Sequence, residues 1–363
     1  MMLIGPTLTR YFSARFLVMI AGVFGTVFAL IYTLDFVELM RRAGDAQGAS
    51  TGLMAMLSLL RTPSVAEQVL PFAMLFGAMA ALLNLSRRLE LVVARAAGIS
   101  VWQFLQPGLL VALGIGIFSV ALYNPLSALM KQQASAIEGR IFATATRASG
   151  GQEIWLRQNS VDGQAIIRAE VAVENTTTLA RVTVFLFSPD GAFRERIEAN
   201  QAELKEGYWD LKNVRILSVD AEPRNHDSYH LATTLDPAQV RQSFTSPDAV
   251  PFWSLSGVIE RTERAGLDAT RYRLQRDMLL ARPLLFVAMV LVAASFSLRF
   301  FRFGGVARMV LGGVVAGFVL YVATEVMKDL GASGLVSPPV AAWFPAVVGS
   351  LLGVLALLYQ EDG

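Results

Sequence analysis

Cysteine is absent from all 363 residues, and charged side chains make up only 17% of them. The lack of cysteine excludes disulfide bonds, thiolate zinc sites and cysteine nucleophiles. Soluble domains carry about 25% charged residues, so the shortage of charge argues against a wholly soluble protein. The net charge of +2 provides none of the basic excess that nucleic-acid binding needs.

Motifs of nucleotide and hydrolase chemistry are also missing. The sequence contains no G-x-x-x-x-G-K-[ST] phosphate loop, no G-x-S-x-G nucleophile turn and no H-E-x-x-H zinc motif. Its two histidines, His226 and His230, are four residues apart but lack a third protein ligand for a metal. We therefore expect no ATP hydrolysis, no catalytic residue and no metal site in this chain, and we interpret both histidines as exposed loop residues.

Long uncharged stretches are what the sequence does contain. Nineteen residues without charge separate Arg15 from Asp35, and 35 separate Arg95 from Lys131. Since about 20 apolar helical residues cross a bilayer, the pattern predicts six membrane spans. The first is longer than a signal-peptide core, so we expect it to be retained. The approximate limits are Phe16–Leu34, Val69–Leu85, Phe104–Leu126, Met278–Leu298, Val306–Met327 and Val340–Tyr359.

Basic residues in the short connecting segments predict the orientation. With the N-terminus inside, the inner segments carry eight of them and the outer segments four, which favours two cytoplasmic termini under the positive-inside rule. Arg282, close to the fourth span, is expected to reach an interface by snorkelling. The inner set is Arg10, Arg15, Arg87, Arg88, Arg95, Arg299, Arg302 and Arg308, and the outer set is Arg41, Arg42, Arg61 and Lys328.

The segment between the third and fourth spans has a different character. Residues 180–187 (ARVTVFLF) alternate with period two, and the turn residues Ser188-Pro189-Asp190-Gly191 follow them. Short strands at this spacing predict a β-sandwich or barrel-like domain, and residues 259–276 read as a helix leading back to the membrane. We expect three parts: spans one to three in 1–126, a β-rich domain in 127–277, and spans four to six in 278–363. Further strands are expected at 153–157, 164–173, 197–204, 208–211 and 214–219.

Two short segments combine charge and apolar side chains in a way that suggests binding. Residues 87–98 predict a short amphipathic helix that contains Glu90 and ends at Gly98, and such a helix fits the groove of a cytoplasmic partner. The alternative is a basic segment that only flanks span two. Arg41 and Arg42 follow span one and could grip phosphate groups, or simply anchor the helix at lipid headgroups.

Small residues recur in the fifth span as Gly313-x-x-x-Gly317. This spacing lets two helices approach closely, and it would suit an interface that opens and closes. Ordinary packing within the chain is the alternative interpretation.

Three segments carry a resemblance to a known family. They are DFVELMRRAG at 35–44, SRRLELVVARAAGIS at 86–100 and GLDATRYRLQRDMLLARPL at 266–284. With these segments, and with three spans on each side of a β-rich insert, the chain resembles the LptF/LptG permeases of the lipopolysaccharide exporter over essentially its whole length. The third segment favours the LptG type, and the LptF type remains the alternative.

The resemblance implies an α-helical membrane protein with six spans and an inserted all-β, β-jellyroll-like periplasmic domain, in the inner membrane of a Gram-negative bacterium. It implies an LptF-type permease, an LptB-type ATPase dimer and LptC as partners. Lipopolysaccharide would enter between span one of one subunit and span five of the other. ATP and magnesium would be bound by the ATPase, so we expect no cofactor in this chain.

The resemblance also assigns roles to residues. The ATPase-coupling set is Arg87, Arg88, Glu90, Leu91, Val92, Arg95, Ala97 and Gly98; the lipopolysaccharide-binding set is Asp35, Glu38, Arg41 and Arg42; and Gly313 and Gly317 would pack at the lateral gate. Asp35 departs from the family pattern, because enterobacterial-type LptG sequences have a lysine in span one. That difference implies either a different lipid headgroup or an ion pair between Asp35 and a basic neighbour.

Two rival functions remain at this point. A secondary transporter would usually place ionisable residues or broken helices near the middle of the membrane, whereas the charges here lie at span ends. A membrane-anchored scaffold would need fewer than six spans.

Overall fold

The computed structural model describes residues 5–43, 50–146, 154–160, 163–172, 178–188, 192–205, 207–218, 223–233, 247–264, 268–303 and 306–361. The chain forms two compact units. The helical unit comprises Met1–Val37, Ser58–Lys131 and Pro247–Gly363. The second unit comprises Glu38–Leu57 and Gln132–Ser246 and contains the β-sheet.

Within the described residues, six long apolar helical segments confirm the six predicted spans. Each contains the predicted apolar run and extends beyond it, because polar residues continue the helices at their ends. They are α1 (Pro6–Ala43), α2 (Thr51–Arg87), the continuous run of α4 (Val101–Phe118), η1 (Ser119–Tyr123) and α5 (Asn124–Thr146), then α8 (Thr270–Phe303), α9 (Val306–Ala332) and α10 (Pro338–Glu361). The element η1 is a π-helical turn that ends two residues before Pro125.

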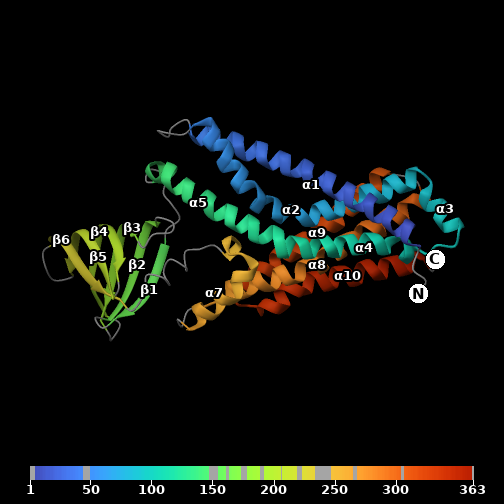
Figure 1. Cartoon of the computed structure of the whole chain (residues 1–363). Coiled ribbons are helices and arrows are strands. Elements are labelled where there is room, and N and C mark those ends of the chain that lie inside the picture. The colour runs from blue at the N-terminus through green and yellow to red at the C-terminus, as the bar shows by residue number, and fades with distance from the viewer. Residues whose placement is uncertain are drawn as a thin grey trace. The chain divides into compact units, whose positions relative to one another are not determined.

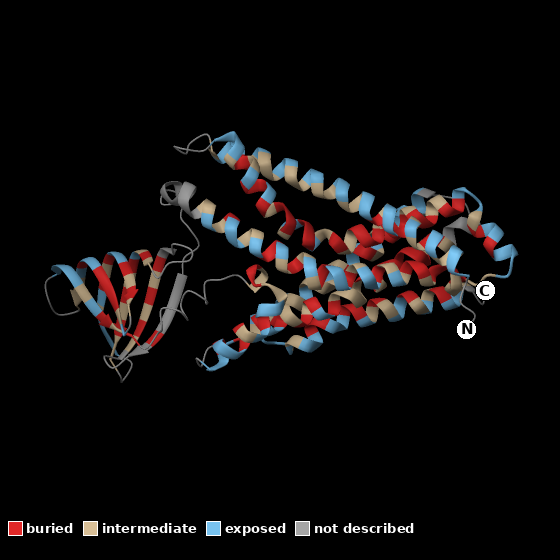
Figure 2. Ribbon diagram, viewed as in Figure 1, coloured by how far each residue is buried: buried red, intermediate tan, exposed pale blue. Residues whose placement is uncertain are grey.

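The apolar core of the helical unit lies among α2, α4 and α8, where buried residues concentrate in Figure 2. Phe104 and Phe286 are fully buried there. A Cβ atom at Gly116 would lie 2.5 Å from the Cα of Pro283, so the backbones of α4 and α8 touch. Close backbone contact of this kind needs glycine, because any side chain would push the two helices apart.

The start of α1, the end of α10 and the short helix α3 (Glu90–Ala96) are at the same end of the helical unit (Figure 1). An even number of crossings produces this arrangement.

In the described part of the insert the β-sheet has six antiparallel strands in sequence order, which confirms the predicted all-β insert (Figure 1). The strands are β1 (Ile154–Ser160), β2 (Gly163–Ala172), β3 (Thr178–Phe187), β4 (Phe193–Lys205), β5 (Tyr208–Ser218) and β6 (Arg224–Ala232). Val182, Val184 and Leu186 are buried on one face, as their alternation predicts. The predicted turn residues 189–191 lie outside the described residues, and β3 and β4 pair on either side of them.

Two predictions about the strands are wrong. The segments 208–211 and 214–219 form one strand, β5, because its pairing with β4 continues past Asn213. Both histidines lie on β6 rather than in a loop: His226 pairs with Val214 and His230 with Asp210. The polar sequence of β6 conceals a strand because its first residues are exposed at the edge of the sheet.

The alternation of buried and exposed residues reverses at the same row of three strands. Val182, Ala199 and Val214 are paired and buried, and so are Leu179, Ala202 and Leu211 three rows away. Between them every strand has two consecutive residues outside the core, and Arg181 and Asn213 adopt positive φ angles of 51° and 53°. In β3 and β5 these left-handed residues turn the following side chains to the opposite side of the strand.

A buried polar contact joins the two ends of the sheet. The side chain of Gln158 on β1 accepts hydrogen bonds from Trp209 Nε1 (3.2 Å) and from Thr233 Oγ1 (2.6 Å). Its own Nε2 donates to the carbonyl of Ala232 on β6 (3.3 Å). Since β1 and β6 are the first and last strands, the sheet must curl to bring them together, as expected for a barrel-like domain.

The predicted helix over 259–276 is two helices. The 3₁₀ turn η2 (Pro247–Ala249) precedes α7 (Phe252–Arg264), and α8 begins at Thr270. Asp268 accepts hydrogen bonds from the hydroxyl (2.5 Å) and the backbone N–H (2.9 Å) of Thr270, which favours a new helix start here. Both bonds favour the ionised carboxylate and hold the pKa of Asp268 below its ordinary value.

Candidate functional site

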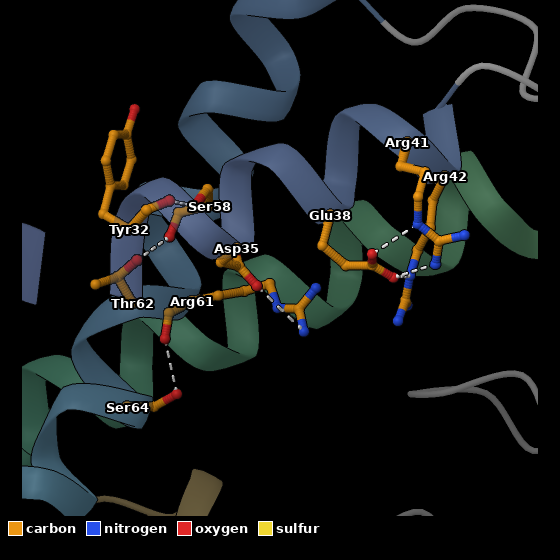
Figure 3. Close-up of polar contacts among 9 residues, drawn as sticks. All are labelled: Tyr32, Asp35, Glu38, Arg41, Arg42, Ser58, Arg61, Thr62 and Ser64. Carbon is orange, nitrogen blue, oxygen red and sulfur yellow. Dashed lines mark hydrogen bonds and ion pairs between the residues drawn. The ribbon is translucent and has the colours of Figure 1, made fainter. Parts of the chain in front are cut away.

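The last turns of α1 carry the residues predicted to bind a charged lipid. Glu38, Arg41 and Arg42 share one face of the helix because they are three and four residues apart. Arg41 donates two hydrogen bonds of 2.8 Å to the Glu38 carboxylate, and Arg42 donates one of 2.8 Å (Figure 3). Both guanidinium groups therefore share a single carboxylate, so the group carries one net positive charge.

Asp35 lies opposite a basic residue of the neighbouring helix. Arg61 was predicted in a loop, but the structure places it in α2, with its Nη2 atom 3.7 Å from Asp35 Oδ1 (Figure 3). Ser58 Oγ donates to the carbonyl of Tyr32 (3.2 Å) nearby, so α1 and α2 are held together at this level. Of the two explanations left open for Asp35, the ion pair with a basic neighbour is present in the structure.

The short helix predicted at 87–98 is α3. Leu91 and Ala94 are buried against the helical unit. On the other face Leu89, Val92 and Val93 are exposed, the last with 67% of its surface. The rest of the predicted set, Arg87, Arg88, Arg95, Ala97 and Gly98, is exposed as well.

The end of α3 confirms the predicted role of Gly98 as a helix stop. Gly98 has a φ of 81°, its N–H bonds to the carbonyl of Arg95 (3.0 Å), and Ile99 N–H bonds to the carbonyl of Ala94 (3.1 Å). This pair of bonds is a Schellman motif, which glycine favours because a side chain would be strained there.

Glu90 connects α3 to the start of α1. Tyr11 donates its hydroxyl hydrogen to Glu90 Oε1 (3.0 Å), and Arg15 donates to the hydroxyl oxygen of Tyr11 (2.9 Å). Glu90 Oε2 is buried and accepts no hydrogen bond within the described residues. The contact between Tyr11 and Glu90 was not predicted from the sequence, because no local pattern links positions 11 and 90.

Gly313 and Gly317 face α2 of the same chain. A Cβ atom at Gly313 would lie 2.6 Å from Met79 Cε, and one at Gly317 would lie 2.2 Å from Leu75 Cδ2. The structure thus shows the packing within the chain that was the alternative interpretation.

A family model described as "Lipopolysaccharide export system permease LptF/LptG" matches residues 10–359. The chain belongs to the LptF/LptG family. The lipopolysaccharide export system permease protein LptG of Haemophilus influenzae is 26% identical over 362 residues, which is 97% of both chains. The protein of that name from Escherichia coli K12 is 24% identical over 361 residues, 98% of both chains.

This LptF/LptG permease also contains a buried polar cluster that the sequence reading missed. Glu67 of α2 is paired with Arg282 of α8, and their side chains are only 8% and 18% exposed. Glu67 also accepts hydrogen bonds from Asn124 Nδ2 (2.9 Å) and from Ser127 Oγ. Arg282 therefore does not snorkel to an interface, because the carboxylate of Glu67 satisfies its charge inside the protein.

Helix α7 is attached beside this cluster in the LptF/LptG permease. The Asn124 side-chain carbonyl accepts a hydrogen bond from the backbone N–H of Phe252 (3.0 Å). Pro125 has no N–H to offer the carbonyl of Ala121, and the indole of Trp253 donates to that carbonyl instead (3.1 Å). The π-helical turn and the proline thus create the acceptor that holds the start of α7.

A pocket of about 380 Å³ opens next to the buried pair. It lies among α2, α8 and α9, with Glu67 and Arg282 at one part of its wall and Met289, Tyr321 and Pro71 at another. Lys328 also lines it and pairs with Glu325 (3.0 Å). Glu67 is the one acidic residue among the 25 residues from Thr62 to Ser86, and this isolation was a signal available in the sequence. The identity of its partner, Arg282, could not be predicted from the sequence.

Proposed function

We propose that this chain is the LptG-type transmembrane subunit of an ATP-driven exporter that extracts lipopolysaccharide from the inner membrane of a Gram-negative bacterium. It would pass the lipid to a periplasmic β-jellyroll bridge toward the outer membrane. Its partners would be an LptF-type permease, an LptB-type ATPase dimer and LptC. The chain would have no catalytic residue, and ATP and magnesium would be bound by the ATPase. The relatives named LptG support this type over the LptF type.

The observation that carries the proposal is the exposure of two spans in a chain of this family. Only 6% of the apolar window of α1 and 17% of that of α9 is buried, against 61% for α2. Spans one and five are the helices between which the lipid would enter. Their unburied apolar surface supports a role for them in contacts with a partner subunit and with lipid acyl chains.

The geometry of α3 supports ATPase docking. Because this chain has no phosphate loop, an ATP-driven transport cycle needs a partner ATPase. Such a partner can bind only side chains that are exposed. Helix α3 offers Val92 and Val93 beside exposed arginines, and it is fastened to α1 through Glu90. If α3 faces the cytoplasm, the start of α1 and the end of α10 face it as well. The β-domain follows the third span and would then be periplasmic, as would the C-terminal end of α1.

Replacement of Glu90 tests the coupling. We expect Glu90→Ala to reduce copurification of the LptB-type ATPase, because it removes the acidic residue of the docking helix together with the hydrogen bond from Tyr11 that fastens this helix to α1. Glu260→Ala removes an exposed helical glutamate from α7 and is the matched control. Full ATPase stoichiometry together with undiminished transport in Glu90→Ala would contradict the assignment.

Charge reversal at the end of α1 tests lipid binding. We expect Arg41→Glu/Arg42→Glu to reduce photocrosslinking of lipopolysaccharide to α1, because three acidic residues would then repel its phosphates. Unchanged crosslinking would mean that the arginines only anchor the helix. Reconstitution with LptB and LptF separates the proposal from a scaffold or a secondary transporter, since only the exporter releases lipid in an ATP-dependent manner.

A further inference from the structure

Asn124 uses both ends of its side-chain amide to join two helices. It is the first residue of α5 and is buried, with 1% of its surface exposed. Its Nδ2 donates to Glu67 Oε1 on α2 (2.9 Å), and its Oδ1 accepts from the backbone N–H of Phe252 (3.0 Å). An ionised carboxylate only accepts and an N–H only donates, so these partners fix which way the amide points. Asn124 therefore bridges α2 and the start of α7.

The contact with Phe252 is one that α7 does not need in order to form a helix. Phe252 is its first residue, and the first N–H groups of a helix have no partner within the helix. At an exposed helix start, water or a local capping side chain satisfies such a group. Here a buried side chain from another helix does so, which fixes where α7 begins relative to α5.

The helices that meet at Asn124 lead to α3 and to both ends of the β-rich insert. Helix α2 is continuous from Glu67 to its end at Arg87, three residues before α3 begins. Helix α5 precedes β1 in the chain, and η2 and α7 follow β6. A further contact ties these two attachments of the insert, since Lys131 Nζ of α5 lies 2.5 Å from Asp248 Oδ2 of η2. One buried amide thus lies where α2 meets both attachments.

The third span has a bending point at this junction. The π-helical turn η1 ends at Tyr123, directly before Asn124, and Pro125 follows directly after it. Sharp bends in helices occur at π-helical turns and at prolines, because the regular backbone hydrogen bonds are interrupted there. The angle between α4 and α5 can therefore change at the residue that holds α2 and α7.

We propose that Asn124 is a positioning residue of the transport cycle. It transmits a displacement of α2 to the start of α7, and hence to the segments that carry the β-rich insert, while the π-helical turn allows α5 to follow. This inference rests on the proposed function, because it assumes that an ATPase docked at α3 displaces α2.

A cluster that only stabilised the buried charge would not need this bridge. Glu67 is paired with Arg282 and also accepts a hydrogen bond from Ser127, so its carboxylate has partners besides Asn124. What Asn124 adds is the link to α7. Loss of that link should therefore change how the helices move together more than it changes ATP hydrolysis by the partner.

Two substitutions at one position isolate the bridging hydrogen bond. Phe252→Pro deletes the backbone N–H that bonds to Asn124, and proline suits the first position of a helix. Phe252→Ala loses the same aromatic ring but keeps the N–H, so it is the matched control. Each variant is assembled in liposomes with the partner permease and the ATPase, and the lipid released per ATP hydrolysed is measured. We expect about fivefold less lipid per ATP from Phe252→Pro than from Phe252→Ala, the factor by which one hydrogen bond shifts an equilibrium, with ATP hydrolysis unchanged.

A second pair of variants approaches the bridge from its other side. Asn124→Leu removes both ends of the bridge at similar volume and is expected to lower the lipid released per ATP at least as much. Ser127→Ala removes another hydrogen bond to Glu67 but leaves the bridge, so it is expected to keep the ratio. This pair decides the question if Phe252→Pro does not assemble.

Three results would be decisive against these expectations. Equal lipid per ATP in Phe252→Pro and Phe252→Ala overturns the inference. A parallel fall of hydrolysis and release in Phe252→Pro, with the ratio unchanged, overturns it too, because a merely structural bond would act in that way. Absence of ATP-dependent lipid release from the unaltered complex overturns the proposed function instead.

Discussion

The buried pair of Glu67 and Arg282 leads to a quantitative prediction about stability. In Glu67→Gln the amide keeps the size of the side chain but leaves the Arg282 charge without its carboxylate. Removal of one partner from a buried ion pair costs about 3–5 kcal/mol. The 18% exposure of Arg282 lets some water reach it, so we expect the lower end of that range, about 3 kcal/mol.

The assay is thermal unfolding of the purified chain in detergent at a fixed heating rate, because membrane proteins commonly unfold irreversibly. About 2–4 °C is lost per kcal/mol in chains of 150–250 residues and less in longer ones, so in this chain of 363 residues the apparent midpoint of Glu67→Gln should fall by about 6 °C or less. Glu260→Gln breaks an exposed ion pair with Arg264 and should change the midpoint by about 1 °C or less.

A double variant decides whether the unpaired charge is the cause. Glu67→Gln/Arg282→Gln removes both charges, so it should recover a large part of the lost stability. If the double variant is no more stable than Glu67→Gln, the loss comes from packing or from the hydrogen bonds, and the reasoning from buried charge is wrong.

Two further predictions concern packing and pH. Gly116→Ala should lower the apparent midpoint by several degrees, because its Cβ would lie 2.5 Å from the backbone of Pro283. Gly114→Ala is the control and should not lower it, because there is open space around Gly114. Equal effects of the two variants would contradict the close contact of α4 and α8. In the β-domain a hydrogen bond from Lys205 holds the pKa of Asp210 below its ordinary value, and the same bond raises the pKa of Lys205. The stabilisation from Asp210 should be complete above about pH 4 and should be lost as the pH falls through the lowered pKa of Asp210 in the folded state. The stabilisation from Lys205 should be lost only above about pH 10.5. Unfolding of the unaltered chain and of Asp210→Asn between pH 2 and 8 measures this, and a difference that persists unchanged at pH 2 would refute it.

The fold was predictable from the sequence where the signal is local. Uncharged runs longer than a bilayer crossing identify the six spans, and period-two alternation identifies β3. The limits of the helices were not predictable in this way, because α2 begins at Thr51, far before its apolar run. Strand β6 was missed for a related reason, since an edge strand with exposed polar residues lacks alternation.

The candidate site was predictable in part. The residues on α1 and α3 could be chosen because each group is contiguous in sequence. Their partners could not, because Asp35 meets Arg61 and Glu90 meets Tyr11 only after the helices have packed. Such pairs depend on distances between helices, which no pattern within one helix contains.

The reversal of alternation in the β-sheet has a consequence for how its strands align. In an ordinary strand a slip of two residues returns every side chain to its proper face, so that error is weakly penalised. Here a slip of two residues would move the point of reversal in one strand away from the matching point in the neighbouring strands. The residues between the two points would then face the wrong side of the sheet. The row that contains Arg181 and Asn213 therefore fixes the register of β3, β4 and β5 relative to one another.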